Sequence, residues 1–141
     1  MKNKGCSAKK GMCGKPEDVA NLQDLLVFVL KGIAVYSEQG KEVVVTVDKK
    51  SGDFVFESLF STITNANFDA KYFEDRVKEA LNVRDTLKAK VAAAGKSFDE
   101  TLPDAATWTS GDVKEFAQKA AEVGVLTTEN EDVRSLRELL T

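Results

Sequence analysis

The chain of 141 residues contains no histidine. Histidine is the usual general base near neutral pH and the commonest metal ligand, so any catalysis by this chain alone would need carboxylates, thiols or lysines. Cysteine and proline each occur only twice, and tryptophan once. Metal or redox chemistry therefore depends on very few side chains, of which Cys6 and Cys13 are the first candidates.

Long apolar runs are also lacking. No uninterrupted apolar segment approaches the roughly 20 residues that cross a bilayer. The N-terminus is polar and has no apolar core of a secretory signal. We therefore expect a cytoplasmic protein without membrane association, where thiols stay free and disulfides are rare. A Cys6–Cys13 disulfide formed on exposure to air is an alternative that a thiol titration would test.

Concentrated positive charge is missing from most of the chain. The net charge is −3, and acids and bases are mixed along the predicted helices. Phosphate binding needs a basic face, so we expect no nucleic-acid partner. The exception is the N-terminus, where five lysines precede the first acid, Glu17. This segment is either a solvated tail or a basic collar around an anionic cofactor. The five residues are Lys2, Lys4, Lys9, Lys10 and Lys15.

The apolar residues that are present follow helical spacing. A helix is predicted from Pro16 to a stop at Gly40 by steps of three and four residues. A second helix is predicted over about 53–65, with Asp53 as its N-cap. Segment 43–47 is rich in β-branched residues, which favours either a strand-like segment or an extended connector. Taken alone, residues 43–56 are also typical of a β-hairpin. The stripe of the first helix comprises Val19, Leu22, Leu26, Val29, Ile33 and Tyr36.

Three more helices are predicted in the second half. One begins after the cap Asp69 and ends at Gly95, with a stripe that Arg84 interrupts. A linker over 96–109, in which Trp108 is expected to anchor the chain to the bundle, leads to a short helix closed by Gly124. The last helix follows the capping-box spacing of Thr128 and Glu131. The apolar residues of the short helix are expected to face the core. They are Val113, Phe116, Ala117, Ala120 and Val123.

These elements predict an all-α fold. We expect 1–15 to form a partial iron–sulfur cluster loop and 16–95 an antiparallel three-helix bundle. Residues 96–141 are then a linker, a short helix and the start of a second, truncated bundle. Residues 131–140 repeat residues 17–26 with six of ten positions identical. The repeat leads us to expect a piece of a larger protein, cut at both ends.

The two cysteines lie in a glycine-punctuated segment just before the first helix. The positive end of that helix and the nearby lysines favour the thiolate, the form that binds metal. Gly11 and Gly14 flank Cys13 and let the backbone bend so that amide groups face sulfur. A cluster or a structural zinc takes four ligands, however, so two thiols complete neither. Metal ligation and unbound thiols both remain open on the spacing alone.

Several segments resemble the hybrid cluster proteins, also called prismane proteins or hydroxylamine reductases. The resemblance covers nearly the whole chain in the expected order. It is carried by Gly5-Cys6-Ser7-Ala8-Lys9-Lys10-Gly11-Met12-Cys13-Gly14-Lys15, Leu22-Gln23-Asp24-Leu25-Leu26, Leu30-Lys31-Gly32, Leu59-Phe60-Ser61-Thr62-Ile63-Thr64-Asn65-Ala66-Asn67-Phe68-Asp69 and Leu102-Pro103-Asp104-Ala105-Ala106-Thr107-Trp108.

The resemblance implies that Cys6 and Cys13 ligate an iron–sulfur cluster, 4Fe–4S or 2Fe–2S, in a longer parent protein. They match the third and fourth of four family cysteines, and the first two are absent from this chain. The ligands of the second, hybrid cluster would lie beyond residue 141. The resemblance also implies two three-helix bundles, which weakens the hairpin reading of 43–56.

The implied function is reduction of hydroxylamine or related small nitrogen oxides, with electrons relayed through the N-terminal cluster. We expect the isolated fragment to be inactive and to hold no cluster by itself. Its expected partners are the remainder of the parent chain and, through Leu136, Leu139 and Leu140 of the last helix, the bundle or another copy of the chain. The alternative is a non-enzymatic helical binding or assembly module.

Overall fold

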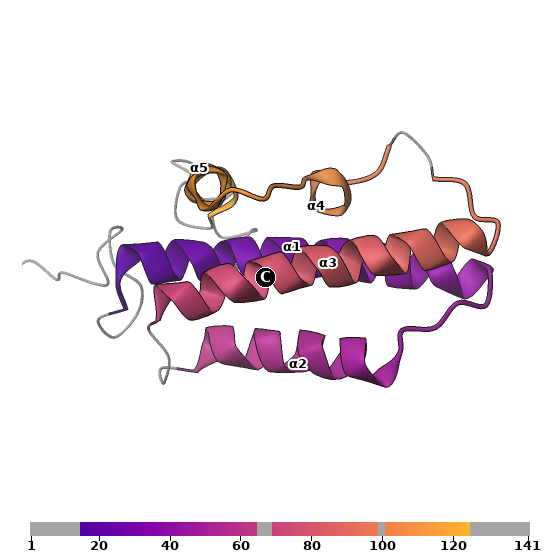
Figure 1. Cartoon of the computed structure of the whole chain (residues 1–141), viewed down its shortest axis with the longest axis horizontal. Coiled ribbons are helices and arrows are strands. Elements are labelled where there is room, and N and C mark those ends of the chain that lie inside the picture. Colours follow the sequence, from indigo (N-terminus) through magenta and orange to yellow (C-terminus); the bar gives the residue numbers. More distant parts are fainter. Residues whose placement is uncertain (1–14, 65–68, 99–100, 125–141) are drawn as a thin grey trace, which may run out of the picture.

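A computed structural model describes residues 15–64, 69–98 and 101–124, and these residues form helices without any strand (Figure 1). The predicted all-α fold is confirmed. Three long helices are followed by one short turn of helix and one further helix. Their bounds are α1 Glu17–Glu42, α2 Lys49–Ile63, α3 Ala70–Ala93, α4 Asp104–Thr107 and α5 Val113–Val123.

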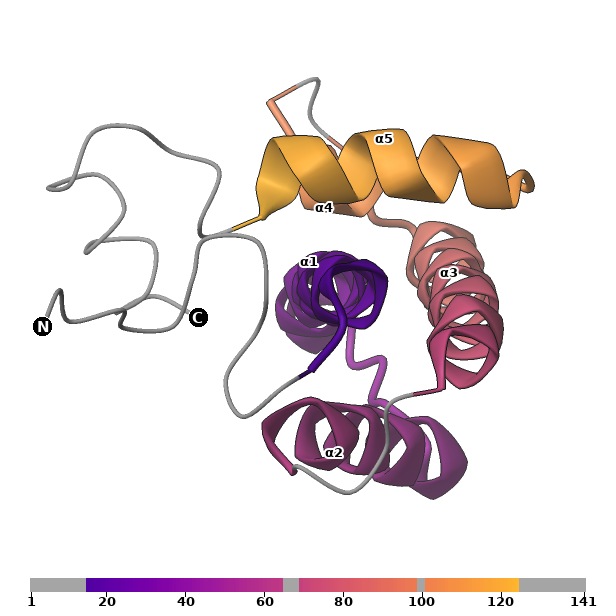
Figure 2. The same cartoon turned by 90° about the vertical axis from the view of Figure 1, so that its left-hand side faces the viewer.

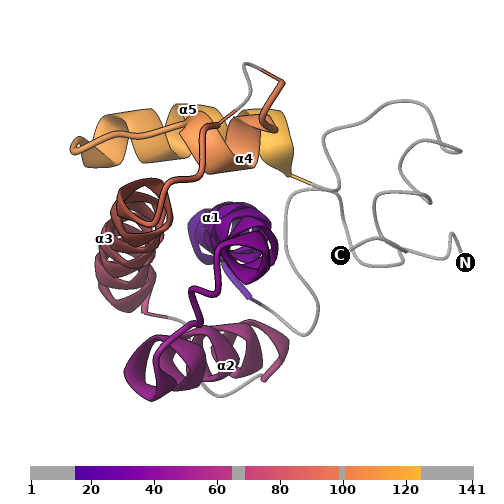
Figure 3. The ribbon, with the colours of Figure 1, turned by 90° about the vertical axis from the view of Figure 1, so that its right-hand side faces the viewer.

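The first three helices form an up-down-up bundle. In Figure 1, α1 and α3 run in the same direction, and α2 runs antiparallel to both. The most extensive packing joins α1 to α3, whereas α2 touches both only lightly. Seen along the bundle, α1 has α3 on one side, α2 below and α5 across its upper side (Figures 2 and 3). The core is therefore built around α1.

Helix α1 is the central helix because apolar residues cover more than one of its faces. All six residues of its predicted stripe are buried, from Val19 to Tyr36. The predicted stop at Gly40 is wrong, since α1 continues to Glu42. Gly40 is buried because chain returning from the end of α1 passes over it: a Cβ there would lie 2.9 Å from the carbonyl oxygen of Val45.

Helix α2 begins earlier than the sequence indicates. Its N-cap is Asp48, not Asp53, and the Asp48 carboxylate accepts hydrogen bonds from the amide of Ser51 at 2.9 Å and from its hydroxyl at 3.1 Å. The Ser51 amide is the main cause of the lowered pKa of Asp48. Asp53 instead pairs with Lys49 within the helix, at 2.6 Å. Residues 43–48 connect α1 to α2 through a turn at 43–44 without forming a strand, and 49–56 belong to α2, so the hairpin alternative is excluded.

Helix α3 has both predicted ends. The Asp69 side chain accepts from the amide of Lys71 at 3.0 Å, and Gly95 ends the helix region with a φ of 99°. A positive φ of this kind favours glycine. The predicted interruption at Arg84 is not a break in the buried stripe, because Arg84 is itself only 1% exposed.

The second half adds α4, which the sequence did not predict, and α5, which it did. Asp112 caps α5 and Gly124 follows its last residue. The inward face differs from the expectation: Phe116 and Ala120 are buried, but Ala117 is exposed and Lys119 is buried in its place. The last predicted helix, after Thr128, lies outside the described residues.

Among the described helices, α1 alone is long and apolar enough to span a membrane by length and composition. The expectation from the sequence rested on uninterrupted apolar segments, none of which is long enough to cross a bilayer. Isolated polar residues interrupt the apolar segment of α1 but add few charges, so its mean hydropathy stays high. Most of the apolar stretch of α1 is buried against the other helices. Burial of this kind is what a core helix of a bundle shows.

Candidate functional site

Cys6 and Cys13, the predicted site residues, lie outside the described residues. The structure describes the point at which their segment joins the bundle. The Lys15 ammonium donates a hydrogen bond to the Oε1 atom of Gln23 on α1, at 2.5 Å, and a longer one to the carbonyl oxygen of Thr62 on α2, at 3.4 Å. The cysteine segment is therefore attached where the start of α1 meets the end of α2.

Pro16 follows Lys15 and stands as the N-cap of α1, one position before the place predicted for it. Glu17 and Asp18 occupy the first turn, where negative charge interacts favourably with the helix end. The Asp18 carboxylate also accepts from the amide of Val19 at 2.9 Å. The local sequence thus fixes the start of α1, and with it the anchor of the cysteine segment.

One cavity, of about 450 Å³, lies between the first turns of α1 and α3 and the side of α5. Three carboxylates, Glu17, Asp18 and Glu74, line it together with apolar residues that include Leu22 and Val113. Within residues 15–64, 69–98 and 101–124, no three histidine, cysteine or acidic side chains are grouped so as to hold a metal ion. This cavity is therefore not a metal centre of the described part of the chain.

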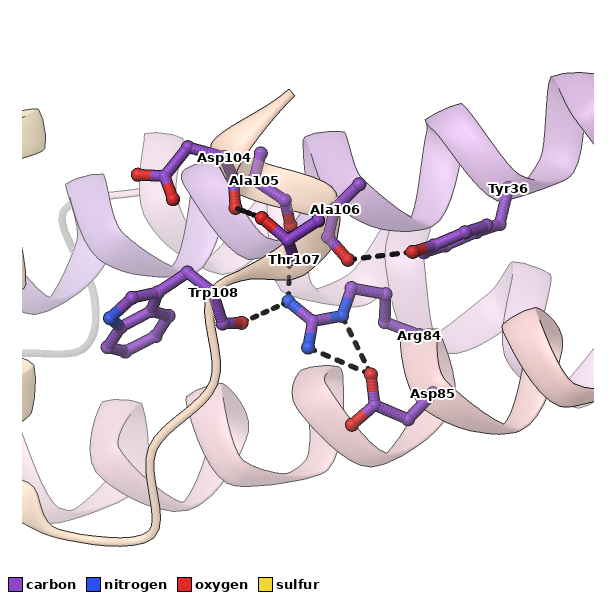
Figure 4. Close-up of polar contacts among 8 residues, drawn as sticks. All are labelled: Tyr36, Arg84, Asp85, Asp104, Ala105, Ala106, Thr107 and Trp108. Carbon is purple, nitrogen blue, oxygen red and sulfur yellow. Dashed lines mark hydrogen bonds and ion pairs between the residues drawn. The ribbon is translucent and has the colours of Figure 1, made fainter. Parts of the chain in front are cut away.

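A buried polar arrangement is built on Arg84 (Figure 4). Its guanidinium, buried between α3 and the linker, donates to the carbonyl oxygen of Ala105 at 3.2 Å and to that of Trp108. It also forms an ion pair with Asp85, at 2.8 Å. A buried arginine needs such partners because an unpaired charge in the interior is costly. Arg84 thus fixes the backbone on both sides of the end of α4.

Helix α1 holds the same turn from the other side. The Tyr36 hydroxyl donates to the carbonyl oxygen of Ala106 at 2.9 Å, a buried contact also drawn in Figure 4. At Gly32 the linker approaches so closely that a Cβ would lie 2.0 Å from the carbonyl oxygen of Ala105. Tyr36 belongs to the predicted apolar stripe, and the structure gives its hydroxyl a buried partner.

Trp108 anchors the linker, as predicted. Its ring meets Phe28 of α1 edge-on, with ring centroids 6.3 Å apart, and lies 6.1 Å from the ring of Phe116 on α5. Aromatic pairs at these distances add to the gain from burial alone. Trp108 therefore joins α1, the linker and α5 into one apolar cluster.

Lys119 of α5 is, like Arg84, a buried cation of the described part of the chain. Its ammonium interacts with the Asp104 carboxylate at the start of α4 and with Glu122 at 2.9 Å, and it lies 5.2 Å from the centre of the Phe28 ring. Burial acts to lower the pKa of Lys119, but the hydrogen bonds to Asp104 and Glu122 outweigh it and raise that pKa. Asp104 is thus a partner of a buried charge.

The comparisons with known proteins identify the class. The sequence pattern of the Prismane/CO dehydrogenase family matches residues 2–141, so the chain belongs to this family. It is 57% identical to a hydroxylamine reductase of Halothermothrix orenii and 58% identical to one of Nitratidesulfovibrio vulgaris. Each alignment covers 99% of this chain and 26% of the relative. A hydroxylamine reductase 2 of Clostridium acetobutylicum is 50% identical.

Family membership confirms the resemblance and implies an iron–sulfur cluster in the longer protein. The donors of this chain do not fit a whole cluster. The sequence has two cysteines and no histidine, and the described residues contribute no further group of ligands. A cluster takes four ligands, so we derive no electron-transfer step within this chain alone.

Sequence reasoning did not find the structural roles of Arg84 and Lys119. Arg84 was taken as an interruption of an apolar stripe, and Lys119 was not singled out, since charged side chains are rarely buried unless they are paired. For Lys119 a signal was present: it lies three residues after Phe116, on the same face of α5. For Arg84 the signal was its place inside an otherwise continuous apolar stripe.

Proposed function

We propose that this chain is the N-terminal helical part of a hydroxylamine reductase, and that Cys6 and Cys13 ligate the iron–sulfur cluster of that part. The observation that carries the proposal is the identity of 57% and 58% to two hydroxylamine reductases over 99% of the chain. Those relatives are about four times as long, and each alignment covers 26% of the relative.

The reaction proposed for the longer protein is the reduction of hydroxylamine to ammonia and water, which consumes two electrons and two protons. An external electron donor supplies the electrons, and related small nitrogen oxides are alternative substrates. This chain contributes two thiolate ligands and a helical support that anchors their segment through Lys15. The remaining ligands come from outside this chain, and the remainder of the longer protein is its proposed partner, in the cytoplasm.

The isolated chain is proposed to be inactive. The alternative is a helical binding or assembly module without redox chemistry, and the exposed apolar side chains of α2 favour it. On either proposal the partner is protein, either the rest of the longer chain or another copy, and not nucleic acid or a membrane.

The experiment uses the uninterrupted reading frame that contains this segment. The whole protein is expressed and purified without oxygen, and hydroxylamine-dependent oxidation of a reduced viologen dye is measured. Cys6→Ser and Cys13→Ser should lose the N-terminal cluster signal and most of the turnover, while the neighbouring Ser7→Ala should keep both. Unchanged iron content and turnover in both cysteine variants would overturn the assignment of these ligands.

A further inference from the structure

Helix α2 carries apolar side chains on two opposite faces. The inner face buries Phe54 against the bundle. The outer face carries Phe56, Leu59, Phe60 and Ile63, here called the outer stripe, whose exposed fractions range from 42% at Leu59 to 80% at Ile63. A helix at the surface of a bundle is typically apolar on its inner side only, whereas a helix that is apolar all round has neighbours on every side. The outer stripe therefore indicates a helix that has a second neighbour in the complete molecule.

The outer stripe borders a groove of about 430 Å³ between α1 and α2, whose other wall includes Gln23 and Val27 of α1. The rings of Phe56 and Phe60 stack with their centroids 6.4 Å apart, so they form one continuous surface. In Figures 2 and 3, α2 lies at the edge of the bundle, and no described helix covers the side that faces away from α1 and α3. Apart from Val44, the large exposed apolar side chains of the described residues all belong to the outer stripe. Apolar surface gathered at one place marks an interaction site.

The wall of the groove also contains a polar atom that an occupant can satisfy. Gln23 is only 5% exposed, and its Nε2 atom has no hydrogen-bond partner among residues 15–64, 69–98 and 101–124. The Oε1 atom of the same amide accepts from the Lys15 ammonium at 2.5 Å, which leaves Nε2 as the donor that needs an acceptor. A buried donor without an acceptor is costly. The groove therefore fits an apolar surface that also brings one carbonyl or carboxylate oxygen.

Charge is confined to the other end of α2. No charged residue occurs from Ser58 to Thr64, where most of the outer stripe lies. The core of a stable protein interface is depleted of charge in the same way. A nucleic acid or an anionic surface would need basic side chains at this place. The occupant is therefore a protein surface. The charged residues of α2 are Lys49, Lys50, Asp53 and Glu57.

We propose that the outer stripe and its groove are the surface on which the remainder of the longer protein packs. This inference rests on the proposed function, which makes the chain one part of such a protein. The lengths of the relatives favour this occupant over a second copy, because each alignment covers 99% of this chain and only 26% of the relative. Interfaces between domains of one chain bury roughly 600–1,500 Å², and the outer stripe supplies the contiguous apolar surface that such an interface needs.

The test compares the 141-residue chain with the whole protein expressed from the uninterrupted reading frame. Hydroxyl radicals are generated in solution by short X-ray pulses, and oxidation of each side chain is measured by mass spectrometry. Phe56 and Phe60 should react readily in the 141-residue chain. Their oxidation rates should fall by about fivefold or more in the monomeric whole protein, because the core of a stable interface is fully buried. Val44, which is 89% exposed and lies outside the groove, is the internal reference.

Equal oxidation rates in the two proteins would overturn the proposal. Protection that appears in the whole protein only as its concentration rises would overturn it in favour of a second copy. Protection already present in the monomeric 141-residue chain would overturn it in favour of cover by the chain itself. Turnover of hydroxylamine is measured on the same preparation. Turnover without protection would refute the interface alone, and protection without turnover would refute the proposed function alone.

A substitution supplies an independent readout. Phe60→Asp places a charge inside the proposed interface, so the oxidation rate of Phe56 in the whole protein should return toward its value in the 141-residue chain. Val44→Asp is the matched control, because it adds the same charge at an exposed apolar residue outside the groove, and it should leave the protection of Phe56 intact. Protection of Phe56 that survives Phe60→Asp unchanged would contradict the proposal.

Discussion

The surroundings of α4 and the helix α2 show two different ways of attaching a segment to the same central helix. Four residues of α4 and its flanks are held by a buried guanidinium, a buried hydroxyl and close backbone packing. The fifteen residues of α2 bury only Phe54 and Ser58, and long polar contacts such as Arg76 to Glu57, at 3.3 Å, supplement them. The length of an element therefore says little about how firmly it is held.

The difference follows from chemistry at each site. Buried hydrogen bonds to backbone carbonyls cannot exchange with water, so breaking them leaves unpaired polar groups. The surface ion pairs of α2 add little to stability, because water can solvate the separated charges. We infer that the α4 turn opens only when the bundle unfolds, whereas α2 can separate from α1 and α3 first.

The largest expected effect is from Arg84→Ala. It leaves the carbonyl oxygens of Ala105 and Trp108 without their buried donor and opens a cavity, so it should lower the free energy of unfolding by about 3–4 kcal/mol. Urea unfolding followed by circular dichroism measures this. Lys90→Ala, which removes a surface cation on the same helix, is the control and should cost under about 0.5 kcal/mol. Equal effects of the two substitutions would refute the role assigned to Arg84.

Gly32→Ala is expected to be nearly as damaging. The added methyl group would meet the backbone of Ala105, which cannot move without breaking the α4 contacts, so we expect a loss of about 2–3 kcal/mol. Gly52→Ala in α2 is the matched control, because a Cβ there has no atom within 4 Å. That variant should gain about 0.5–1 kcal/mol from its better helix propensity. A stable Gly32→Ala protein would show that the linker is not packed against α1 as described.

Native-state hydrogen exchange separates the two attachments without any substitution. Amides of α2 should open at a free energy about 2 kcal/mol below that of the amides of α1 and α3, because α2 has few buried contacts. The measurement is exchange at increasing low concentrations of denaturant. A single opening free energy for all three helices would show that α2 is part of the same cooperative unit.

The smallest effect concerns Lys119 and pH. Its pKa is raised in the folded state, so its pairing with Asp104 and Glu122 stabilises the fold fully below the unfolded pKa and is lost as pH rises through the folded one. The unfolded value is about 10.4. Lys119→Met should therefore have a free energy of unfolding about 0.5–1 kcal/mol below that of the parent chain at pH 8. This difference in free energy should narrow above about pH 10.5. A gap that is constant with pH would show that packing alone explains the effect.

Local patterns predicted the elements whose ends depend on nearby residues. Asp69 was identified as a cap, and Gly95 and Gly124 as helix ends, because capping acts within one turn. The all-α fold followed from helical spacing. The start of α2 was missed because two aspartates, Asp48 and Asp53, both suit an N-cap, and only the hydrogen bonds of Ser51 distinguish them.

What could not be predicted depends on contacts between distant residues. Gly40 reads as a helix stop, but the returning chain at Val45 makes it a packing position. Arg84 reads as an interruption, because its carbonyl partners lie 21 and 24 residues further along the chain. The iron–sulfur assignment of Cys6 and Cys13 came from resemblance to a family and not from spacing, since two thiols fit several chemistries. Family membership is now shown, and the ligand role stays a prediction.

The most direct test of the account is anaerobic reconstitution of the 141-residue chain with iron and sulfide, followed by iron and sulfide analysis of the monomer fraction and its visible absorption. If the chain is a helical support that carries two of the four cluster ligands, it cannot hold a cluster alone. The prediction is therefore no stable brown monomeric species and thiols that remain titratable at Cys6 and Cys13. A monomer that retains a stoichiometric four-iron cluster through gel filtration would contradict it.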